Sequence, residues 1–374
     1  MGTVHAEALK RVRGVELIGI QGSSPGKSRA AAAELELPKA YDRWEDLVGD
    51  EEVDAVHITT PNRWHFPQTV DALQAGKHVM CEKPLAMTTE ESSELLRLAK
   101  ETGLVCGVNY NLRFYPMNLE AKQRVAAGEL GKIHSVFGSY QQDWLLYQTD
   151  YNWRVLAEEQ GELRAVADIG THWIDLVQNI TGQNVEALFA DLHTVHPIRR
   201  RPKGEVETFS GKLGEARETE PVKITTDDIG CLILRLDGGA RGMMFVSQTT
   251  PGRKNCLRYE IAGSNGSIEF NSEEPNHLWR GYREKANEIL LKDPGLNDEA
   301  TRRFIDYPGG HAEGFPDTFK MGFRAFYDQI AGAERPPEFA TFEDGHREIE
   351  LCEAVIRSAA EGRWVQLKSD HQQS

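Results

Sequence analysis

Cysteine is scarce in this sequence, and none of it is spaced for metal binding. The five cysteines lie at positions 81, 106, 231, 256 and 352, so they form no C-x-x-C pair. This spacing argues against a zinc finger and against a disulfide framework. Long apolar runs are also missing, as is the composition of a signal peptide. We therefore expect a cytoplasmic protein with no membrane partner.

Positive charge is in deficit. The 43 lysines and arginines are outnumbered by 58 aspartates and glutamates, which gives a net charge of -15 and a pI near 5.3. Phosphate backbones require a concentrated basic surface, so this composition argues against a nucleic-acid partner. The one notable basic run, 199–203, is followed by acidic residues, and we interpret it as a solvated loop. The 374 residues are enough for two domains with cores of their own.

The first third of the chain alternates strand and helix patterns. Apolar runs typical of buried strands occur at 15–20, 53–60, 78–81 and 104–108, and helical patterns occur at 26–35, 67–76 and 88–101. The last of these helices opens with Thr88-Thr89-Glu90-Glu91, which has capping-box spacing. Strands separated by helices form a parallel sheet with helices on both faces. We therefore predict a Rossmann-type domain over residues 1–108.

The pattern changes after residue 108. Asp237-Gly238-Gly239 and Ser264-Asn265-Gly266 each join two strands as a hairpin, which favours an antiparallel sheet. The predicted strands are 133–142, 185–193, 228–236, 240–248, 257–263 and 267–271. Helical patterns cover 165–181 and about 342–362, whereas 273–319 is typical of a long irregular loop that could form a lid. The second domain, 109–374, is therefore predicted to be an α+β domain with a large, mostly antiparallel open sheet.

Two polar motifs follow neighbouring strands of the first domain. Thr60-Pro61-Asn62 ends the strand at 53–60, and Glu82-Lys83-Pro84 follows the strand at 78–81. In open parallel sheets the carboxyl ends of the strands face the ligand crevice, so the two motifs indicate one site. Taken alone, Glu82-Lys83-Pro84 is equally well interpreted as a solvated turn.

A third motif lies in the second domain. Asp168, His172 and Asp175 are spaced i, i+4 and i+7, which places them on one face of a helix. On spacing alone, a surface carboxylate–imidazole pair is the commoner interpretation. A metal site is a second alternative, because Asp and His four residues apart can share an ion. No third ligand at a suitable spacing is evident, and we predict no metal.

These three motifs, in this order, resemble those of the Gfo/Idh/MocA family of NAD(P)-dependent oxidoreductases. That family acts mostly on sugars, sugar phosphates and cyclitols. Its Glu-Lys-Pro tripeptide matches Glu82-Lys83-Pro84, and its Thr-Pro-Asn motif with a following histidine matches Thr60-Pro61-Asn62 and His65. Its Asp-x-Gly-x-His-x-x-Asp signature matches Asp168, Gly170, His172 and Asp175. Three motifs in the right order make a specific signal.

The resemblance implies hydride transfer between a nicotinamide and a secondary hydroxyl or ketone of a sugar, sugar derivative or cyclitol. Lys83 would exchange the hydroxyl proton, because burial and a nearby cationic nicotinamide both disfavour its charged form. His172 would share this proton, and the Asp168 carboxylate would fix the tautomer of the histidine. The implied catalytic residues are therefore Lys83, His172 and Asp168.

The resemblance also implies which residues surround the ligands. The cofactor-binding positions are Gly2, Ser23, Ser24, Lys27, Arg29, Thr60, Pro61, Asn62, His65, Glu82, Lys83, Asn109, Trp153 and Arg154. The substrate-binding positions are Arg113, Tyr140, Gln142, Asp143, Asp168, His172 and His311. Such a mix of aromatics, amides and charged groups suits a polyol, because each buried hydroxyl needs a hydrogen-bond partner.

The sequence departs from the family at its beginning. A Rossmann domain opens with a strand and a G-x-G-x-x-G turn, whose glycines let the backbone approach the pyrophosphate. Here Met1-Gly2-Thr3-Val4-His5 resembles only the last glycine and the helix after it. We expect a start codon assigned too late or a truncated chain, with a genuine non-binder as the alternative. The strands on either side of the missing one are expected to be unpaired.

A second departure concerns the choice of cofactor. In NAD enzymes an acidic residue normally follows the second strand and holds the ribose 2′-hydroxyl. Here Gln21-Gly22-Ser23-Ser24 takes that place, and Lys27 and Arg29 follow. No carboxylate would repel a 2′-phosphate, and two cations could bind one. The sequence therefore predicts NADP, with NAD possible.

Two other functions fit the same motifs. One is a glycoside-cleaving enzyme of this fold that uses a bound nicotinamide to oxidise C3 transiently. The other is a non-catalytic regulator that binds a dinucleotide, although the presence of Lys83, Asp168 and His172 favours an enzyme. The second-domain sheet of this family usually pairs with a copy of itself. A homo-oligomer, dimer or tetramer, is therefore expected.

Overall fold

A computed structural model describes residues 1–203 and 218–367 of the chain. It divides into two compact units, one of Met1–Tyr115 with Glu313–Ile349 and the other of Pro116–Ala312 with the chain from Glu350. This division differs from the predicted boundary after residue 108, because residues 313–349 return to the first unit. There β16 (Ala340–Thr341) pairs antiparallel with β5 (Cys106–Val108), and α10 (Phe315–Ile330) packs against α1 (Gly2–Lys10).

The first unit contains a parallel sheet in two pieces. Its remaining elements are β1 (Gly19–Gln21), α2 (Pro25–Glu34), β2 (Lys39–Tyr41), α3 (Trp44–Val48), β3 (Ala55–Ile58), α4 (His65–Gln74), β4 (His78–Cys81) and α5 (Thr89–Thr102). Strands β3, β4 and β5 are parallel neighbours, and β1 pairs in parallel with β2 in a separate sheet. Within the described ranges β1 and β3 each pair on one side only, as the sequence led us to expect.

Gly2, at the start of α1, lies near both pieces of this sheet. A Cβ on Gly2 would be 3.3 Å from Oγ1 of Thr59, just after β3, and 4.0 Å from Cδ1 of Ile20 in β1. The amino end of α1 therefore lies near the carboxyl ends of both strands. In this fold class that is the position from which a helix offers its N–H groups to an anion.

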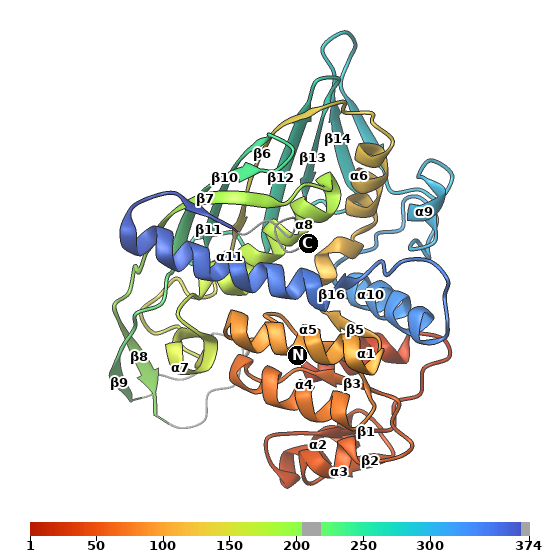
Figure 1. Ribbon diagram of the computed structural model, residues 1–374, viewed down its shortest axis with the longest axis vertical. Coiled ribbons are helices and arrows are strands. Elements are labelled where there is room, and N and C mark those ends of the chain that lie inside the picture. The colour runs from red at the N-terminus through yellow and green to blue at the C-terminus, as the bar shows by residue number, and fades with distance from the viewer. Residues whose placement is uncertain (204–217, 368–374) are drawn as a thin grey trace. The chain divides into compact units, whose positions relative to one another are not determined.

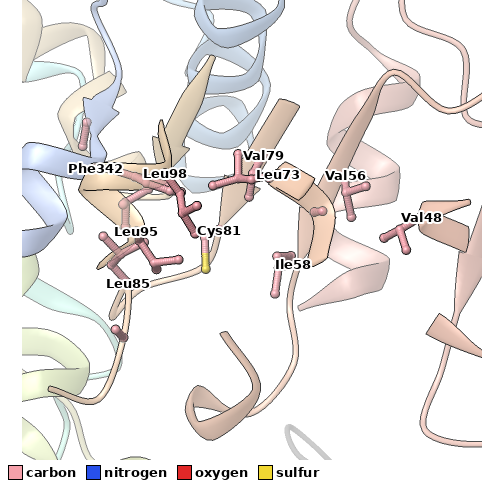
Figure 2. Close-up of a cluster of buried hydrophobic side chains, with 14 of the residues drawn as sticks. Val48, Val56, Ile58, Leu73, Val79, Cys81, Leu85, Leu95, Leu98 and Phe342 are labelled. Atoms are coloured by element: carbon pink, nitrogen blue, oxygen red, sulfur yellow. The ribbon is translucent and has the colours of Figure 1, made fainter. Parts of the chain in front are cut away.

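The core of the first unit forms between the parallel strands and helices α4 and α5. Figure 2 shows Leu73 of α4 and Leu95 of α5 with Val79 and Cys81 of β4 in this cluster. Helix α5 begins close to the predicted residue because Thr88 Oγ1 accepts a hydrogen bond from the N–H of Glu91, 3.2 Å away. The buried β4 thus holds the residues that follow Cys81 in a fixed place.

The second unit is built on a sheet of nine strands. Its helices are α6 (Pro116–Ala126), α7 (Ala157–Gln160), α8 (Thr171–Thr181) and α9 (Glu299–Arg302), and α11 (Phe342–Glu361) runs from the first unit into this one. Its strands are β6 (Ile133–Gln141), β7 (Val185–His193), β10 (Ile229–Leu236), β11 (Arg241–Ser247), β12 (Cys256–Gly263), β13 (Ser267–Asn271), β14 (His277–Gly281), β15 (Glu288–Leu291) and β17 (Val365–Gln366). Only the pairing of β11 with β6 is parallel, so the prediction of a large, mostly antiparallel sheet is confirmed.

One face of this sheet carries α8. Figure 1 shows β6, β12, β13 and β14 side by side, with α6 and α8 beside them. Trp173 of α8 is fully buried, and its Nε1 donates to the carbonyl oxygen of Arg258 at 2.9 Å. A Cβ on Gly138 of β6 would lie 2.6 Å from that nitrogen, so only glycine leaves room for the indole. This contact fixes α8 on the sheet.

The structure of the second unit contradicts two predictions made from the sequence. Residues 273–319 are not one irregular loop, because they contain β14, β15, α9 and the start of α10. The run at 199–203 is not a solvated loop, because it enters β8 (Ile198–Pro202), which pairs with β9 (Thr219–Lys223). Arg199 is fully buried there, and its Nη2 lies 2.6 Å from Asp228 Oδ1.

The elements that were not predicted also include β2, α3, α6 and α10. The terminal helix, in contrast, spans Phe342–Glu361, close to the predicted 342–362. No helix within the described ranges has the length and hydropathy needed to cross a bilayer.

Candidate active site

The Lys83 segment leaves the buried end of β4. The backbone on either side of Cys81 is tied to both neighbouring strands, because the N–H of Glu82 donates to the carbonyl of Ile58 at 2.9 Å and the N–H of Asn109 to the carbonyl of Cys81 at 2.8 Å. Lys83 itself is half-buried, and the peptide bond between Lys83 and Pro84 is cis. Lys83 therefore follows a strand end whose backbone is hydrogen-bonded to both neighbouring strands.

Glu82 points into the protein rather than toward solvent. Its Oε1 accepts hydrogen bonds from His5 Nε2 at 2.8 Å and from Asn109 Nδ2 at 2.7 Å. Burial alone would raise the pKa of Glu82, but the His5 hydrogen bond and the charges of His5 and Lys83 together hold this pKa well below its usual range. Glu82 is therefore an ionised carboxylate directly before Lys83 in the sequence, and it is hydrogen-bonded to Asn109.

His65 connects the two predicted cofactor loops. Its Nδ1 is 2.6 Å from the carbonyl oxygen of Pro84, and its Nε2 is 2.9 Å from that of Thr60. Burial lowers the pKa of His65, so the neutral ring donates to one carbonyl at a time. Thr60 Oγ1 also donates to Gln68 at 2.8 Å, and Asn62 is buried in the short 3-10 helix that follows. His65 therefore holds the loop backbones together, with both ring nitrogens directed at protein.

The residues after β1 form the start of α2. Ser24 caps the helix, because its Oγ accepts from the N–H of Lys27 at 3.3 Å. The side chains of Ser23, Ser24 and Lys27 are exposed, and Arg29 forms an exposed ion pair with Asp42 at 2.7 Å. An exposed pair of this kind contributes little stability, so the Arg29 guanidinium can change partner readily.

In the second unit, Asp168 lies in a π-helical turn, Val166–Gly170, which runs directly into α8. Gln248 Nε2 donates to Asp168 Oδ2 at 2.7 Å, and Arg154 Nε is 3.6 Å from Asp168 Oδ1. One carboxylate oxygen therefore accepts a hydrogen bond, and the other lies near a guanidinium group. The sequence predicts an uninterrupted helix here, whereas π-turns often mark functional positions because they redirect side chains.

His172 and Tyr140 lie close together. Their ring centroids are 6.4 Å apart with an edge-to-face orientation, and His172 is 8% exposed. Tyr140 Oη donates to Asn255 Oδ1 at 2.7 Å, and Gln142 Nε2 donates to the same atom at 2.8 Å. The structure thus brings His172, Tyr140 and Gln142 together on α8 and the end of β6, with Asn255 as a shared partner that sequence reasoning missed.

Two family descriptions match the chain and together cover most of it. The first, "Oxidoreductase family, NAD-binding Rossmann fold", matches residues 1–110, and the second, "GFO/IDH/MocA C-terminal domain", matches residues 118–269. A 1,5-anhydro-D-fructose reductase from Ensifer adhaerens is 36% identical over 96% of this chain and 93% of its own length. A levoglucosan dehydrogenase from Pseudarthrobacter phenanthrenivorans is 30% identical over 92% of this chain and 88% of its own.

The chain belongs to the Gfo/Idh/MocA family of oxidoreductases. A solved structure agrees with this assignment. Levoglucosan dehydrogenase in complex with NADH and levoglucosan superposes with a TM-score of 0.87 at 27% identity, covering 99% of this chain and 97% of that one. The Rossmann-type fold predicted for the first domain is therefore confirmed.

The remaining residues that were predicted to bind the cofactor or the substrate make several kinds of contact. The Arg154 guanidinium lies over the Trp153 ring, 4.4 Å from its centroid, and Asp143 Oδ2 accepts from exposed Lys254 at 2.5 Å. Buried Arg113 lies 3.3 Å from Asp344, a first-unit partner. His311 is exposed, and its carbonyl oxygen accepts from Lys292 Nζ at 2.7 Å.

A buried charge cluster behind Asp168 was not predicted as part of a site. Arg164 is fully buried, donates to Gln248 Oε1 at 3.1 Å and forms an ion pair with Asp228. Asp227 accepts the backbone N–H groups of Arg164 at 2.6 Å and Val166 at 2.9 Å. Because Gln248 also donates to Asp168, this cluster helps to hold the Asp168 carboxylate in place. Arg164 and Gln248 are 84 positions apart, and no spacing rule connects them.

The residues of the first unit fit a dinucleotide at several points. The carboxyl ends of β1, β3 and β4 supply the exposed serines, the Thr60 loop and Lys83, which is the edge where a Rossmann-type sheet binds ligands. In the described ranges, no group of three or more His, Cys, Asp or Glu side chains is arranged to hold a metal ion.

Proposed function

We propose that this chain transfers a hydride between a nicotinamide cofactor and a secondary hydroxyl or ketone of a sugar, sugar derivative or cyclitol. The observation that carries the proposal is that each unit holds its own polar groups in a structured position: Lys83 just after β4, and Asp168 and His172 in the π-turn and the helix α8 that follows it. When bound, the nicotinamide supplies or accepts the hydride. The named relatives act on levoglucosan and 1,5-anhydro-D-fructose, which supports a polyhydroxylated ring as the substrate.

The roles of the side chains follow from their settings. Lys83 takes the hydroxyl proton during oxidation and returns it during reduction. In this proposal His172 shares the proton, and Asp168, which accepts from Gln248 and lies 3.6 Å from Arg154, fixes the tautomer of the histidine. Tyr140 and Gln142, both tied to Asn255, present fixed polar groups to ring hydroxyls.

A panel assay tests this function. The full chain is mixed with NAD or NADP and with levoglucosan, L-sorbose or myo-inositol, and with NADH or NADPH and 1,5-anhydro-D-fructose, while absorbance of the reduced nicotinamide is followed. We expect turnover with at least one substrate. Release of free sugar from a glycoside without net cofactor change would support the glycoside-cleaving alternative instead. Cofactor binding without any turnover across sugars, cyclitols and glycosides would support the regulator.

We further propose that NADP is the preferred cofactor. Support comes from the start of α2, where the helix N-terminus, two exposed serines, Lys27 and a weakly held Arg29 surround the position after β1. A 2′-phosphate carries the charge that such a set binds well. A solved complex of a relative contains NADH, and tighter binding of NAD than of NADP would count against this preference.

We also propose that the outer face of the nine-stranded sheet joins two copies of the chain. Four apolar side chains are exposed on three adjacent strands: Phe137 of β6, Ile233 of β10, and Met243 and Phe245 of β11. Met243 is directly opposite both Phe137 and Ile233 in the register, so the four make one continuous patch. Contiguous exposed apolar surface of this kind favours association.

A further inference from the structure

A series of hydrogen-bonded side chains, which we call the hydrogen-bond chain, runs through the first unit from Tyr327 to Glu82. Tyr327 Oη is 3.2 Å from His57 Nε2, and His57 Nδ1 is 3.0 Å from His5 Nδ1. His5 Nε2 is in turn 2.8 Å from Glu82 Oε1. The members come from α10, β3, α1 and the end of β4. None of the roles described above uses Tyr327, His57 or His5.

Apolar rings surround the middle of this chain. The Phe323 ring lies 4.7 Å from the centroids of both His5 and His57, and the His57 and Tyr327 rings are nearly parallel, at 8°. His5 is only 2% exposed, whereas His57 and Tyr327 are partly exposed. These hydrogen bonds therefore run from a partly exposed tyrosine to the buried Glu82 carboxylate, which directly precedes Lys83 in the sequence.

Charged and polar groups lie at both ends of the hydrogen-bond chain. Glu82, Lys83 and the neutral Asn109 amide lie at its inner end, and Asp54 acts electrostatically on Tyr327 at its outer end. Desolvation by the surrounding rings lowers the pKa of His57, and positive charge on His5 lowers it further. Burial raises the pKa of Tyr327. His57 and the tyrosine are therefore both neutral at physiological pH and able to pass a proton without storing one.

Two proton arrangements satisfy all three hydrogen bonds. In the first, Tyr327 donates to His57 Nε2, His57 Nδ1–H donates to His5 Nδ1, and His5 Nε2–H donates to Glu82. In the second, every bond between Tyr327 and His5 is reversed, and His5 carries one extra proton as an imidazolium beside the Glu82 carboxylate. One proton entering or leaving at Tyr327 converts one arrangement into the other, with only O–H and N–H bonds changed.

We propose that Tyr327, His57 and His5 carry protons between solvent and the His5–Glu82 pair, so that the charge around Lys83 stays balanced during turnover. When Lys83 takes the substrate's hydroxyl proton, its new positive charge disfavours the proton on the neighbouring His5. That proton leaves through His57 and Tyr327 to water. The steps reverse when Lys83 is deprotonated again. The three residues position charge and touch no substrate, and this inference rests on the proposed function.

The replacement Tyr327→Phe tests the chain, because it removes the outer hydroxyl and keeps the ring. With a substrate from the panel that supports turnover of the unmodified protein, we expect its turnover to fall on the order of tenfold, less than the ~10²–10⁴ typical of a direct acid–base group. Added imidazole should restore the rate by carrying protons to His57 directly. The solvent deuterium isotope effect on turnover should also rise, because proton release becomes slow. Tyr41→Phe is the control, since it removes a hydroxyl bonded to Asp50 at 2.7 Å in the same unit.

The outcomes separate this inference from the proposed function. Normal turnover of Tyr327→Phe would overturn the proton chain, as would a loss that neither imidazole nor deuterated solvent alters. If the unmodified protein turns over no substrate, the proposed function fails, and a second measurement still tests the chain. Exchange of the His5 and His57 ring N–H protons with solvent, followed by NMR, should slow in Tyr327→Phe. Unchanged exchange would contradict the chain.

Discussion

Gln248 Nε2 donates a 2.7 Å hydrogen bond to Asp168 Oδ2, and Gln248 Oε1 accepts from Arg164 at 3.1 Å. One fully buried amide thus joins the π-turn carboxylate to the arginine that pairs with Asp228. The Asp168 carboxylate is therefore oriented by residues that were not among the predicted site positions. Its reactivity should depend on them.

The first prediction concerns this amide. We expect Gln248→Leu to lower kcat by about 10- to 100-fold, because a hydrogen bond to a charged group contributes about 1.5–3 kcal/mol. KM should change little. Gln178→Leu is the matched control, since the side chain of Gln178 accepts from the backbone of Val185 at 2.8 Å. Steady-state kinetics on both variants check the prediction, and equal kcat values for the two would contradict it.

The second prediction assigns proton transfer to Lys83 and His172. Lys83→Ala and His172→Ala should each reduce turnover by about 10²–10⁴, the usual contribution of general acid–base catalysis. Cofactor binding, measured by calorimetry, should remain nearly intact. Lys77→Ala is the control, because Lys77 bonds only a backbone carbonyl of Asp50 among its described contacts, at 2.9 Å. A variant with near-normal turnover would remove that residue from the mechanism.

The third prediction concerns cofactor preference. Direct titration should show NADP bound more tightly than NAD, and Lys27→Ala combined with Arg29→Ala should remove most of the difference. Arg43→Ala provides the comparison, because Arg43 forms a similarly exposed pair with Asp46 at 2.9 Å. Tighter binding of NAD by the unmodified protein would overturn the preference.

The fourth prediction follows from the divided sheet of the first unit. A strand between β1 and β3 would satisfy backbone groups on both sides, and each buried unpaired group costs about 1–3 kcal/mol. A protein extended upstream with an apolar strand ending in G-x-G-x-x should therefore unfold at higher denaturant concentration and bind dinucleotide more tightly. Equal midpoints and equal affinities for the two forms would show that this position needs no strand.

The fifth prediction concerns association through the outer sheet face. Met243→Lys should shift the protein to a smaller species in light scattering after gel filtration, because it places a charge in the centre of the apolar patch. Leu296→Lys serves as the control, since Leu296 is 60% exposed and lies outside the sheet. If Met243→Lys leaves the mass unchanged, the proposed interface is wrong.

Helices and strands whose ends are marked by nearby capping or turn residues could be predicted from the sequence. The helix predicted at 88–101 is α5, Thr89–Thr102, and the residues that end it, Thr88 as the N-cap and Gly103 with φ of 65°, directly flank it in the sequence. The hairpin strands β10 to β13 were likewise found from their turn residues. Strands β14 and β15 were missed because polar and charged residues interrupt them. Their pairing places Arg280 opposite Glu288, a match visible only across strands.

Only candidate site residues that belong to a recognisable motif could be predicted from the sequence. Lys83, Asp168 and His172 were predicted by resemblance, and each lies in or just after a helix or strand. Asn255, Arg164 and Gln248 were not found, because their contacts join strands and loops distant in the chain. The interpretation of Arg199 failed for a related reason. Its neighbours in sequence are exposed, whereas its partner Asp228 is 29 residues away and buried.

The return of residues 313–349 to the first unit has a consequence for synthesis. Strand β5 gains its outer neighbour β16, and α1 its partner α10, only after the whole intervening unit has left the ribosome. Domains usually fold in the order in which they emerge. Here the amino-terminal unit must remain incomplete until the second unit has been made, so a fragment ending near residue 115 should not fold as an independent protein.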